Sequence, residues 1–166
     1  MTTKTINIYE FDELSEKAQK KAHDNFKDND LNDLSYDLQI ELDYDLDYLL
    51  EENNIICTNR SPKIYYSLTN SQGDGVCFTG DYTYDNQDIK ITYKGRYNHE
   101  YSTDIEGQFK SEVKNREFLN LYYSICKQLE KHGYSFLDDQ NTIEYFIEHI
   151  NSNDIVFTEE GNTYQE

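Results

Sequence analysis

The sequence lacks several features that mark large classes of protein. It contains no tryptophan, one proline and seven glycines. It has no apolar run of about 18 residues, which excludes a typical transmembrane helix, and its first residues lack the apolar core of a signal peptide. The three cysteines are widely spaced and show no C-x-x-C pattern, which argues against a disulfide framework or a zinc site. We therefore expect reduced thiols in a cytoplasm.

Hydrophobic residues are also scarce, at 36% of the 166 residues. A low apolar fraction is typical of disorder, but disordered chains are poor in aromatic residues as well. This chain has 16 tyrosines and eight phenylalanines. We expect one folded domain over residues 1–166, with a core of Leu, Ile, Phe and Tyr.

Basic residues are missing from two segments. Residues 28–54 carry ten acids and residues 138–166 carry eight, and neither segment contains Lys or Arg. Acids and bases balance in the remainder, so the two segments account for the whole net charge of −18. Solubility does not require charge to be segregated in this way, which makes the acidic segments candidates for a function.

Two secondary-structure patterns fit the first acidic segment. Polar and apolar residues alternate over 36–48, which is typical of a strand. Leucines in the same region recur every three or four residues, which is typical of a helix: Leu31, Leu34, Leu38, Leu42, Leu46 and Leu49. A strand of this length would be unusual, and Asp and Glu are poor strand residues. The sequence therefore predicts a helix over 33–53.

A helix over 33–53 would align its carboxylates in two rows with a spacing of four residues. Each like-charge pair at that spacing costs a few tenths of a kcal/mol, so the pattern does not serve stability. Three tyrosines lie among the acids, and Tyr is a preferred anchor in protein interfaces. The candidate partner-binding residues are Asp33, Tyr36, Asp37, Glu41, Asp43, Tyr44, Asp45, Asp47, Tyr48 and Glu51.

The remaining pattern predicts an α+β fold, in which an antiparallel meander of four to five strands packs against three to four helices. The expected strands are 3–9, 63–69, 76–84, 88–94 and about 96–101. The other expected helices lie near 15–28, 112–132 and 142–150, capped by Ser15 at the start of the first, Gly133 at the end of the second and an Asn141–Glu144 capping box at the start of the third. Residues 153–158 resemble a last strand, and we expect a loose tail over 159–166.

The motif "SQGDG" joins two expected strands. Its glycines permit positive φ angles and its Asp can accept hydrogen bonds from nearby N–H groups, which indicates a hairpin turn. The alternative is a small backbone cradle for an anion or a protein partner. The alternative turn site comprises Ser71, Gln72, Gly73, Asp74 and Gly75.

Two other motifs favour structure over chemistry. Cys77 lies between Val76 and Phe78 on an expected strand, which is typical of a packed thiol and not of a nucleophile. Residues 28–33 begin like a calcium loop, but Asp33 replaces the required glycine and Gln39 the bidentate glutamate. We predict no catalytic residue, no metal site and no cofactor.

Several segments together resemble a family of small phage and prophage proteins. They are "YEFDELSEKAQKKA", the acidic helical segment, "YYSLTNSQGDGVCFTG", "KGRY" and "FTEEG". Members of that family are uncharacterised and are sometimes labelled antitoxin-like. The resemblance implies a phage origin and a bacterial cytoplasm, and it assigns no catalytic residues.

These observations lead to two main hypotheses of function. In the first, the acidic helix imitates nucleic acid and inhibits a host defence protein with a basic groove, such as a CRISPR nuclease. In the second, the SQGDG turn and the sheet face bind a protein or a small anion without mimicry. An enzyme built on Cys77 ranks last, and a solvated acidic face is the alternative to any function of the charge. We expect no direct binding of nucleic acid or membrane.

Overall fold

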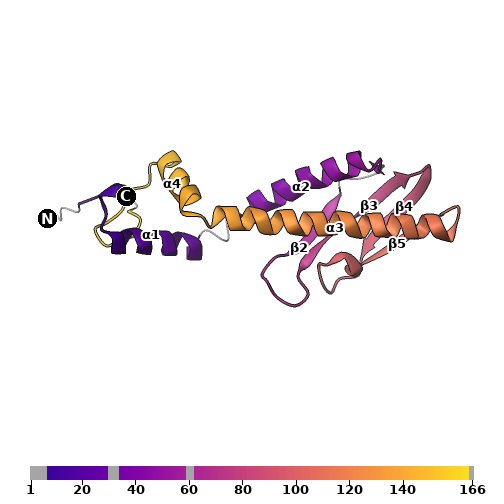
Figure 1. The fold of residues 1–166 in the computed structure, drawn as a ribbon, viewed down its shortest axis with the longest axis horizontal. Coiled ribbons are helices and arrows are strands. Elements are labelled where there is room, and N and C mark those ends of the chain that lie inside the picture. The colour runs from indigo at the N-terminus through magenta and orange to yellow at the C-terminus, as the bar shows by residue number, and fades with distance from the viewer. Residues whose placement is uncertain (1–6, 30–33, 59–61, 165–166) are drawn as a thin grey trace, which may run out of the picture. The chain divides into compact units, whose positions relative to one another are not determined.

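The computed structural model describes residues 7–29, 34–58 and 62–164 (Figure 1). The predicted α+β class is confirmed, because the described residues form four α-helices and five antiparallel strands. They divide into two compact units. One unit comprises Tyr36–Phe136, and the other comprises Met1–Ser35 together with Leu137–Glu166.

The sheet lies in the unit of residues 36–136 and is organised around β3. Its strands are β1 Ile56–Cys57, β2 Lys63–Ser67, β3 Gly75–Tyr84, β4 Gln87–Tyr93 and β5 Thr103–Gly107. The order is β1-β3-β4-β5, and β2 also pairs with β3. All pairings are antiparallel, as expected for strands joined by short loops.

Two long helices, α2 Leu34–Glu52 and α3 Glu112–Gln140, pack their apolar side chains into the core of this unit. The helix predicted over 33–53 is therefore confirmed by α2. Tyr122 of α3 ties the helix to the sheet, because its buried hydroxyl donates to the carbonyl of Phe78 at 3.0 Å and accepts from Thr103 at 3.1 Å. The most deeply buried core residues here are Leu42, Leu46, Phe78, Tyr82, Ile89, Ile91, Phe118, Tyr122, Ile125 and Leu129.

Helix α3 does not end at Gly133, as the sequence suggested, but continues to Gln140. Gly133 is buried, and a Cβ atom there would lie 2.5 Å from the Cδ1 of Leu68 and 3.6 Å from the Cδ2 of Leu42. The glycine is therefore a close-packing position where α3 meets Leu68, just after β2, and α2, and it is not a helix terminator. Tertiary packing outweighs its intrinsic tendency to end a helix.

The last strand of the meander is also displaced from its predicted place. Residues 96–101 do not form a strand. Glu100–Ser102 form a 3-10 turn, and the strand is β5 Thr103–Gly107. Polar side chains draw the preceding backbone out of the ladder. Asn98 donates to the carbonyl of Tyr66 at 2.8 Å, and the His99 ring accepts from the backbone N–H of Tyr101 at 3.2 Å.

The other unit is helical, with α1 Glu16–Asn29, α4 Ile143–Ser152 and the short 3-10 turn η1 Phe11–Glu13. Ser15 caps α1 as predicted, because its hydroxyl accepts from the N–H of Ala18. Helix α4 is capped by Thr142, whose hydroxyl accepts from Tyr145, and not by Asn141. The buried core of this unit is Leu14, Ala18, Ala22, Phe146, Ile150 and Phe157.

The two ends of the chain differ from prediction. The expected strand 3–9 lies partly outside the described residues, and its described end makes only an isolated bridge between Tyr9 and Phe157. Over 159–164 the expected loose tail is instead a fixed turn. Gly161 is buried and its N–H donates to the carbonyl of Thr158 at 2.9 Å.

Candidate functional site

Helix α2 buries one face and exposes an acidic one. Its core-facing leucines are only 1–4% exposed: Leu38, Leu42, Leu46, Leu49 and Leu50. The remaining face carries all seven carboxylates of the helix: Asp37, Glu41, Asp43, Asp47, Glu51 and Glu52 are exposed and Asp45 is half-buried. The predicted partner-binding residues over 36–51 therefore lie together on one helix, while Asp33 lies outside the described residues.

The charge density of this face is close to that of a nucleic-acid strand. From Asp37 to Glu52 the helix rises about 22 Å. Seven carboxylates and no basic residue lie on that length. The helix therefore places one negative charge on roughly every 3–4 Å of its axis, and one strand of B-DNA places one on roughly every 3.4 Å.

Two of these carboxylates are engaged within the protein. Asp43 accepts a hydrogen bond from the side-chain amide of Gln39 at 2.9 Å. Asp45 lies 3.0 Å from the ring nitrogen Nδ1 of His132 on α3. Within residues 36–52, the carboxylates of Asp37, Glu41, Asp47, Glu51 and Glu52 make no hydrogen bond or ion pair to another described residue, which leaves them open to a partner.

A row of aromatic side chains runs between the two rows of acids. Tyr36, Ile40, Tyr44 and Tyr48 follow one another at intervals of four residues and so share one line along the helix. The rings of Tyr36 and Tyr44 are each 72% exposed and that of Tyr48 is 64% exposed. Tyrosine side chains usually bury much of their area in a core or an interface, so three largely exposed tyrosines in one row are unusual. Ile40 completes the row and was missed from the sequence, although its spacing from Tyr36 was visible there.

The SQGDG motif forms a turn centred on Asp74. The Asp74 carboxylate accepts hydrogen bonds from Ser67 Oγ at 2.7 Å, the N–H of Thr69 at 2.6 Å and the N–H of Ser71 at 2.9 Å. The hydroxyl of Tyr134 on α3 also donates to it, at 3.1 Å. Partial burial alone would raise the pKa of Asp74, but the hydrogen bonds from Ser71, Ser67 and Thr69 outweigh it and hold the pKa well below its usual range.

The glycines of the turn are needed for close packing. Gly73 has a φ of +98° and Gly75 a φ of +149°. A Cβ on Gly73 would lie 2.6 Å from the ring of Tyr97, and one on Gly75 would lie 2.8 Å from the Cα of His99. Within the motif, Ser71 and Gln72 are the exposed residues. The turn is therefore built mainly from internal contacts, as the hairpin interpretation predicts.

Asp74→Asn is expected to destabilise the protein by about 1–2 kcal/mol at neutral pH, because a half-exposed charged acceptor of several hydrogen bonds is lost. The pKa of Asp74 is lowered by folding, so its contribution is present above its unfolded pKa of roughly 3.9 and is lost as the pH falls through the lower folded pKa. The difference in unfolding free energy between wild type and variant should therefore shrink below about pH 4. Denaturant titrations across pH measure it, with exposed Glu106→Gln as the control; a difference that grows on acidification would contradict this account.

Cys77 is fully buried in β3, and burial raises its pKa to about 12. Burial likewise raises the pKa of the Cys126 thiol, which is also fully buried. A thiol with a raised pKa and no solvent access is a poor nucleophile. This arrangement matches the prediction that Cys77 is a packing residue.

Alkylation by iodoacetamide under native conditions should therefore modify Cys57, which is half-buried, well before Cys77 or Cys126. All three should react once the protein is unfolded. Mass spectrometry of tryptic peptides over time gives the order. Rapid native modification of Cys77 would show that the thiol is accessible and activated.

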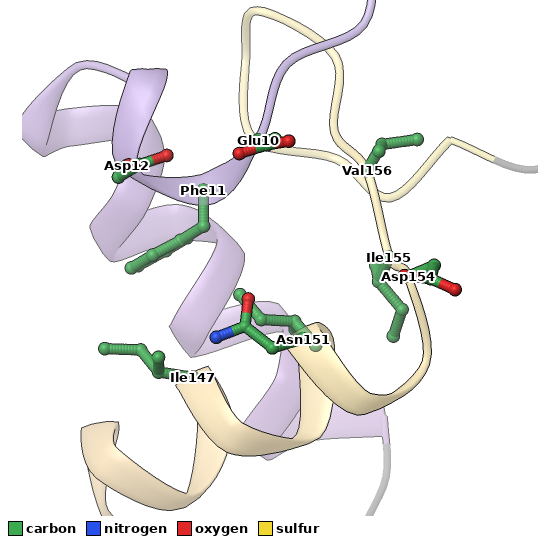
Figure 2. A pocket seen from close by; sticks show the side chains of 9 residues that line it. Glu10, Phe11, Asp12, Ile147, Asn151, Asp154, Ile155 and Val156 are labelled. Carbon is green, nitrogen blue, oxygen red and sulfur yellow. The ribbon is translucent and has the colours of Figure 1, made fainter.

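A cavity of about 380 Å³ lies in the unit that contains α1 and α4 (Figure 2). Its wall combines apolar side chains such as Phe11 and Ile147 with the polar residues Glu10, Asp12, Asn151 and Asp154. No His, Cys, Ser, Lys or Arg is among its nine lining residues. The cavity therefore offers carboxylates but no thiol, serine hydroxyl or amine nucleophile, and no cation for binding an anion.

Within the described ranges, no group of three or more His, Cys, Asp or Glu side chains could hold a metal ion. The calcium-loop pattern of residues 28–33 lies largely outside those ranges. No helix of the described chain is long and apolar enough to cross a membrane.

The chain was compared with family models, curated proteins and solved structures, and none of them matches it.

Proposed function

We propose that this protein binds a nucleic-acid-binding protein through the exposed face of α2 and blocks it by occupying its basic groove. The observation that carries the proposal is the density of carboxylates between Asp37 and Glu52, which is close to that of one DNA strand over a length of about 22 Å. Most of these carboxylates have no partner among the described residues of the chain.

The rigidity of the helix supports the proposal. Leu38, Leu42 and Leu46 anchor α2 in the core, so its acidic face is presented in a fixed geometry before a partner binds. A preorganised surface loses less conformational entropy on binding than a flexible acidic tail would lose. The helix also retains like-charge neighbours such as Asp37–Glu41 and Asp47–Glu51, which weaken it in isolation.

The alternative function, in which the SQGDG turn binds a protein or a small anion, has less support. The charge at the centre of the turn is the carboxylate of Asp74, which would repel an anion. Its oxygens and the N–H groups of Thr69 and Ser71 are already paired with one another. The exposed part of the turn consists of Ser71 and Gln72 and is small compared with the exposed face of α2.

The resemblance to phage and prophage proteins suggests where such a protein would act. A phage protein in a bacterial cytoplasm benefits from blocking host defence, and defence nucleases carry positively charged channels for their guide and target strands. We therefore propose a nucleic-acid-binding defence protein, such as a CRISPR nuclease, as the class of partner.

Affinity capture from a bacterial lysate tests the proposed function. The immobilised wild-type protein should retain proteins whose natural ligands are nucleic acids, and added nucleic acid should release them, because both compete for one groove. A column of the variant Asp37→Asn/Glu41→Gln/Asp47→Asn/Glu51→Gln, here called the neutralised variant, should retain much less. Retained proteins that nucleic acid does not displace would contradict mimicry.

The neutralised variant itself should be folded and more stable than wild type, by about 1 kcal/mol, because the like-charge pairs Asp37–Glu41, Glu41–Asp45, Asp43–Asp47 and Asp47–Glu51 on one helix are all removed. Asp45 is kept in this variant because of its contact with His132. Thermal unfolding at low and high salt measures the gain, which should be smaller at high salt because salt already screens the repulsion. A clear loss of stability would mean that these carboxylates have a structural role.

A further inference from the structure

The aromatic row on α2 gives information about the partner that the carboxylates do not give. A groove for duplex DNA is matched by charge alone, because the phosphates form the outer surface of the duplex. Grooves for single strands combine cationic side chains with exposed aromatic rings on which bases stack. A mimic of a single strand therefore needs rings as well as charges.

Helix α2 has both rings and charges on its exposed face. Tyr36, Ile40, Tyr44 and Tyr48 form one row, and carboxylates flank the row on both sides, Asp37 and Glu41 on one and Asp47 and Glu51 on the other. Among the described residues, the rings of Tyr36, Tyr44 and Tyr48 make no ring stacking contact with another side chain, so their faces are open.

The spacing of the rings also fits. Tyr44 and Tyr48 lie one turn apart, which is about 6 Å along the axis. Two bases that hold an aromatic ring of a protein between them lie roughly 7 Å apart, twice the stacking distance of about 3.4 Å. An aromatic side chain of a partner could therefore enter between the two tyrosines much as it enters between two bases.

We propose that the partner's groove is a binding channel for single-stranded nucleic acid, lined by cations and aromatic rings, and that the tyrosine row of α2 takes the place of the bases. This inference rests on the proposed function and narrows it. The charge complementarity selects a basic surface, and the exposed rings select a surface that also offers aromatic faces.

The test uses the protein captured from the lysate and two competitors, an oligothymidylate and a mixed-sequence DNA duplex, at equal phosphate concentration. The oligothymidylate should release the captured protein at a concentration at least about tenfold lower than the duplex. The double variant Tyr44→Ala/Tyr48→Ala should bind the captured protein about tenfold or more weaker at every salt concentration, because stacking is not ionic. Tyr101→Ala, which removes another exposed ring at 62% exposure, is the matched control and should bind as wild type does.

The outcomes separate the two proposals. If the duplex releases the captured protein as well as the oligothymidylate does, or if the tyrosine variant binds like wild type, the single-strand inference is wrong while mimicry stands. If neither competitor releases the captured protein, or if wild type retains nothing beyond the neutralised variant, both proposals are wrong. Circular dichroism of the tyrosine variant should match wild type, because both rings are largely exposed and no core contact is lost.

Discussion

The neutralised variant is expected to associate with its partner about 10- to 100-fold more slowly than wild type at low salt. Four of the seven carboxylates between Asp37 and Glu52 lose their charge in this variant, so the field that steers the two proteins together is much reduced. The helix and its leucine anchors are unchanged. Stopped-flow or surface-based kinetics with the captured partner measure the effect, which should appear mainly in the association rate constant.

A matched control removes the same number of charges elsewhere. The variant Glu106→Gln/Asp139→Asn/Glu148→Gln/Glu159→Gln changes four exposed acids outside α2. The comparison with the control is made at physiological ionic strength, where the Debye length is about 8 Å and charges outside the docking face contribute little to association. The control should associate at close to the wild-type rate. Equal slowing in both variants would show that net charge matters and that the position of the charges does not.

Gly161→Ala is expected to destabilise the unit of α1 and α4 by about 3–5 kcal/mol, the largest stability effect of any change considered. Gly161 has a φ of +78°, and a Cβ atom there would overlap the backbone carbonyl of Ala18 in α1. Because the obstacle is backbone in the first turn of a packed helix, it cannot move aside as a flexible side chain would. Hydrogen exchange of peptides from α1 and α4 should show the loss of protection.

Gly95→Ala is the matched control for this change. Gly95 has nearly the same φ, +82°, but a Cβ atom there would meet nothing within 4 Å. It should therefore cost only the left-handed conformational penalty, about 1–2 kcal/mol. A similar loss for both variants would mean that backbone conformation alone, and not the contact with Ala18, explains the effect at Gly161.

The helix on which the proposed function rests could be predicted from sequence. The alternation of polar and apolar residues over 36–48 favoured a strand, and length and composition favoured a helix. The helix formed because Leu38, Leu42, Leu46 and Leu49, which recur every third or fourth residue, reach the core. The two acid rows follow from helix geometry, so the exposed face of α2 was predictable in outline, including its tyrosines.

The errors in the predicted element boundaries have a common cause, which is contact between residues that are distant in sequence. Gly133 continues a helix because Leu42 and Leu68 pack onto it. The strand after residue 96 begins late because Asn98 bonds to the carbonyl of Tyr66, 32 residues earlier. The contact between Asp45 and His132 joins residues 87 apart. Local patterns of period two or four contain no information about such contacts.

The turn at residues 71–75 shows what a motif can and cannot indicate. Its glycines and Asp74 predicted a turn, and a turn is present. The hydrogen bond from Tyr134 of α3 to Asp74 could not be foreseen, because it depends on where α3 lies. That contact is one of the observations that make the motif structural and leave α2 as the better candidate for binding.

The most direct test of the account is the salt dependence of partner binding by wild type and by the neutralised variant. If the face of α2 occupies a groove built for nucleic acid, the logarithm of the wild-type affinity should fall steeply and linearly with the logarithm of salt concentration, as it does for nucleic-acid complexes. The neutralised variant should bind more weakly at low salt and with a distinctly shallower slope, so that the two affinities converge at high salt. Equal affinities and equal slopes for the two proteins across the salt series would contradict the account, because the carboxylates of α2 would then face solvent in the complex.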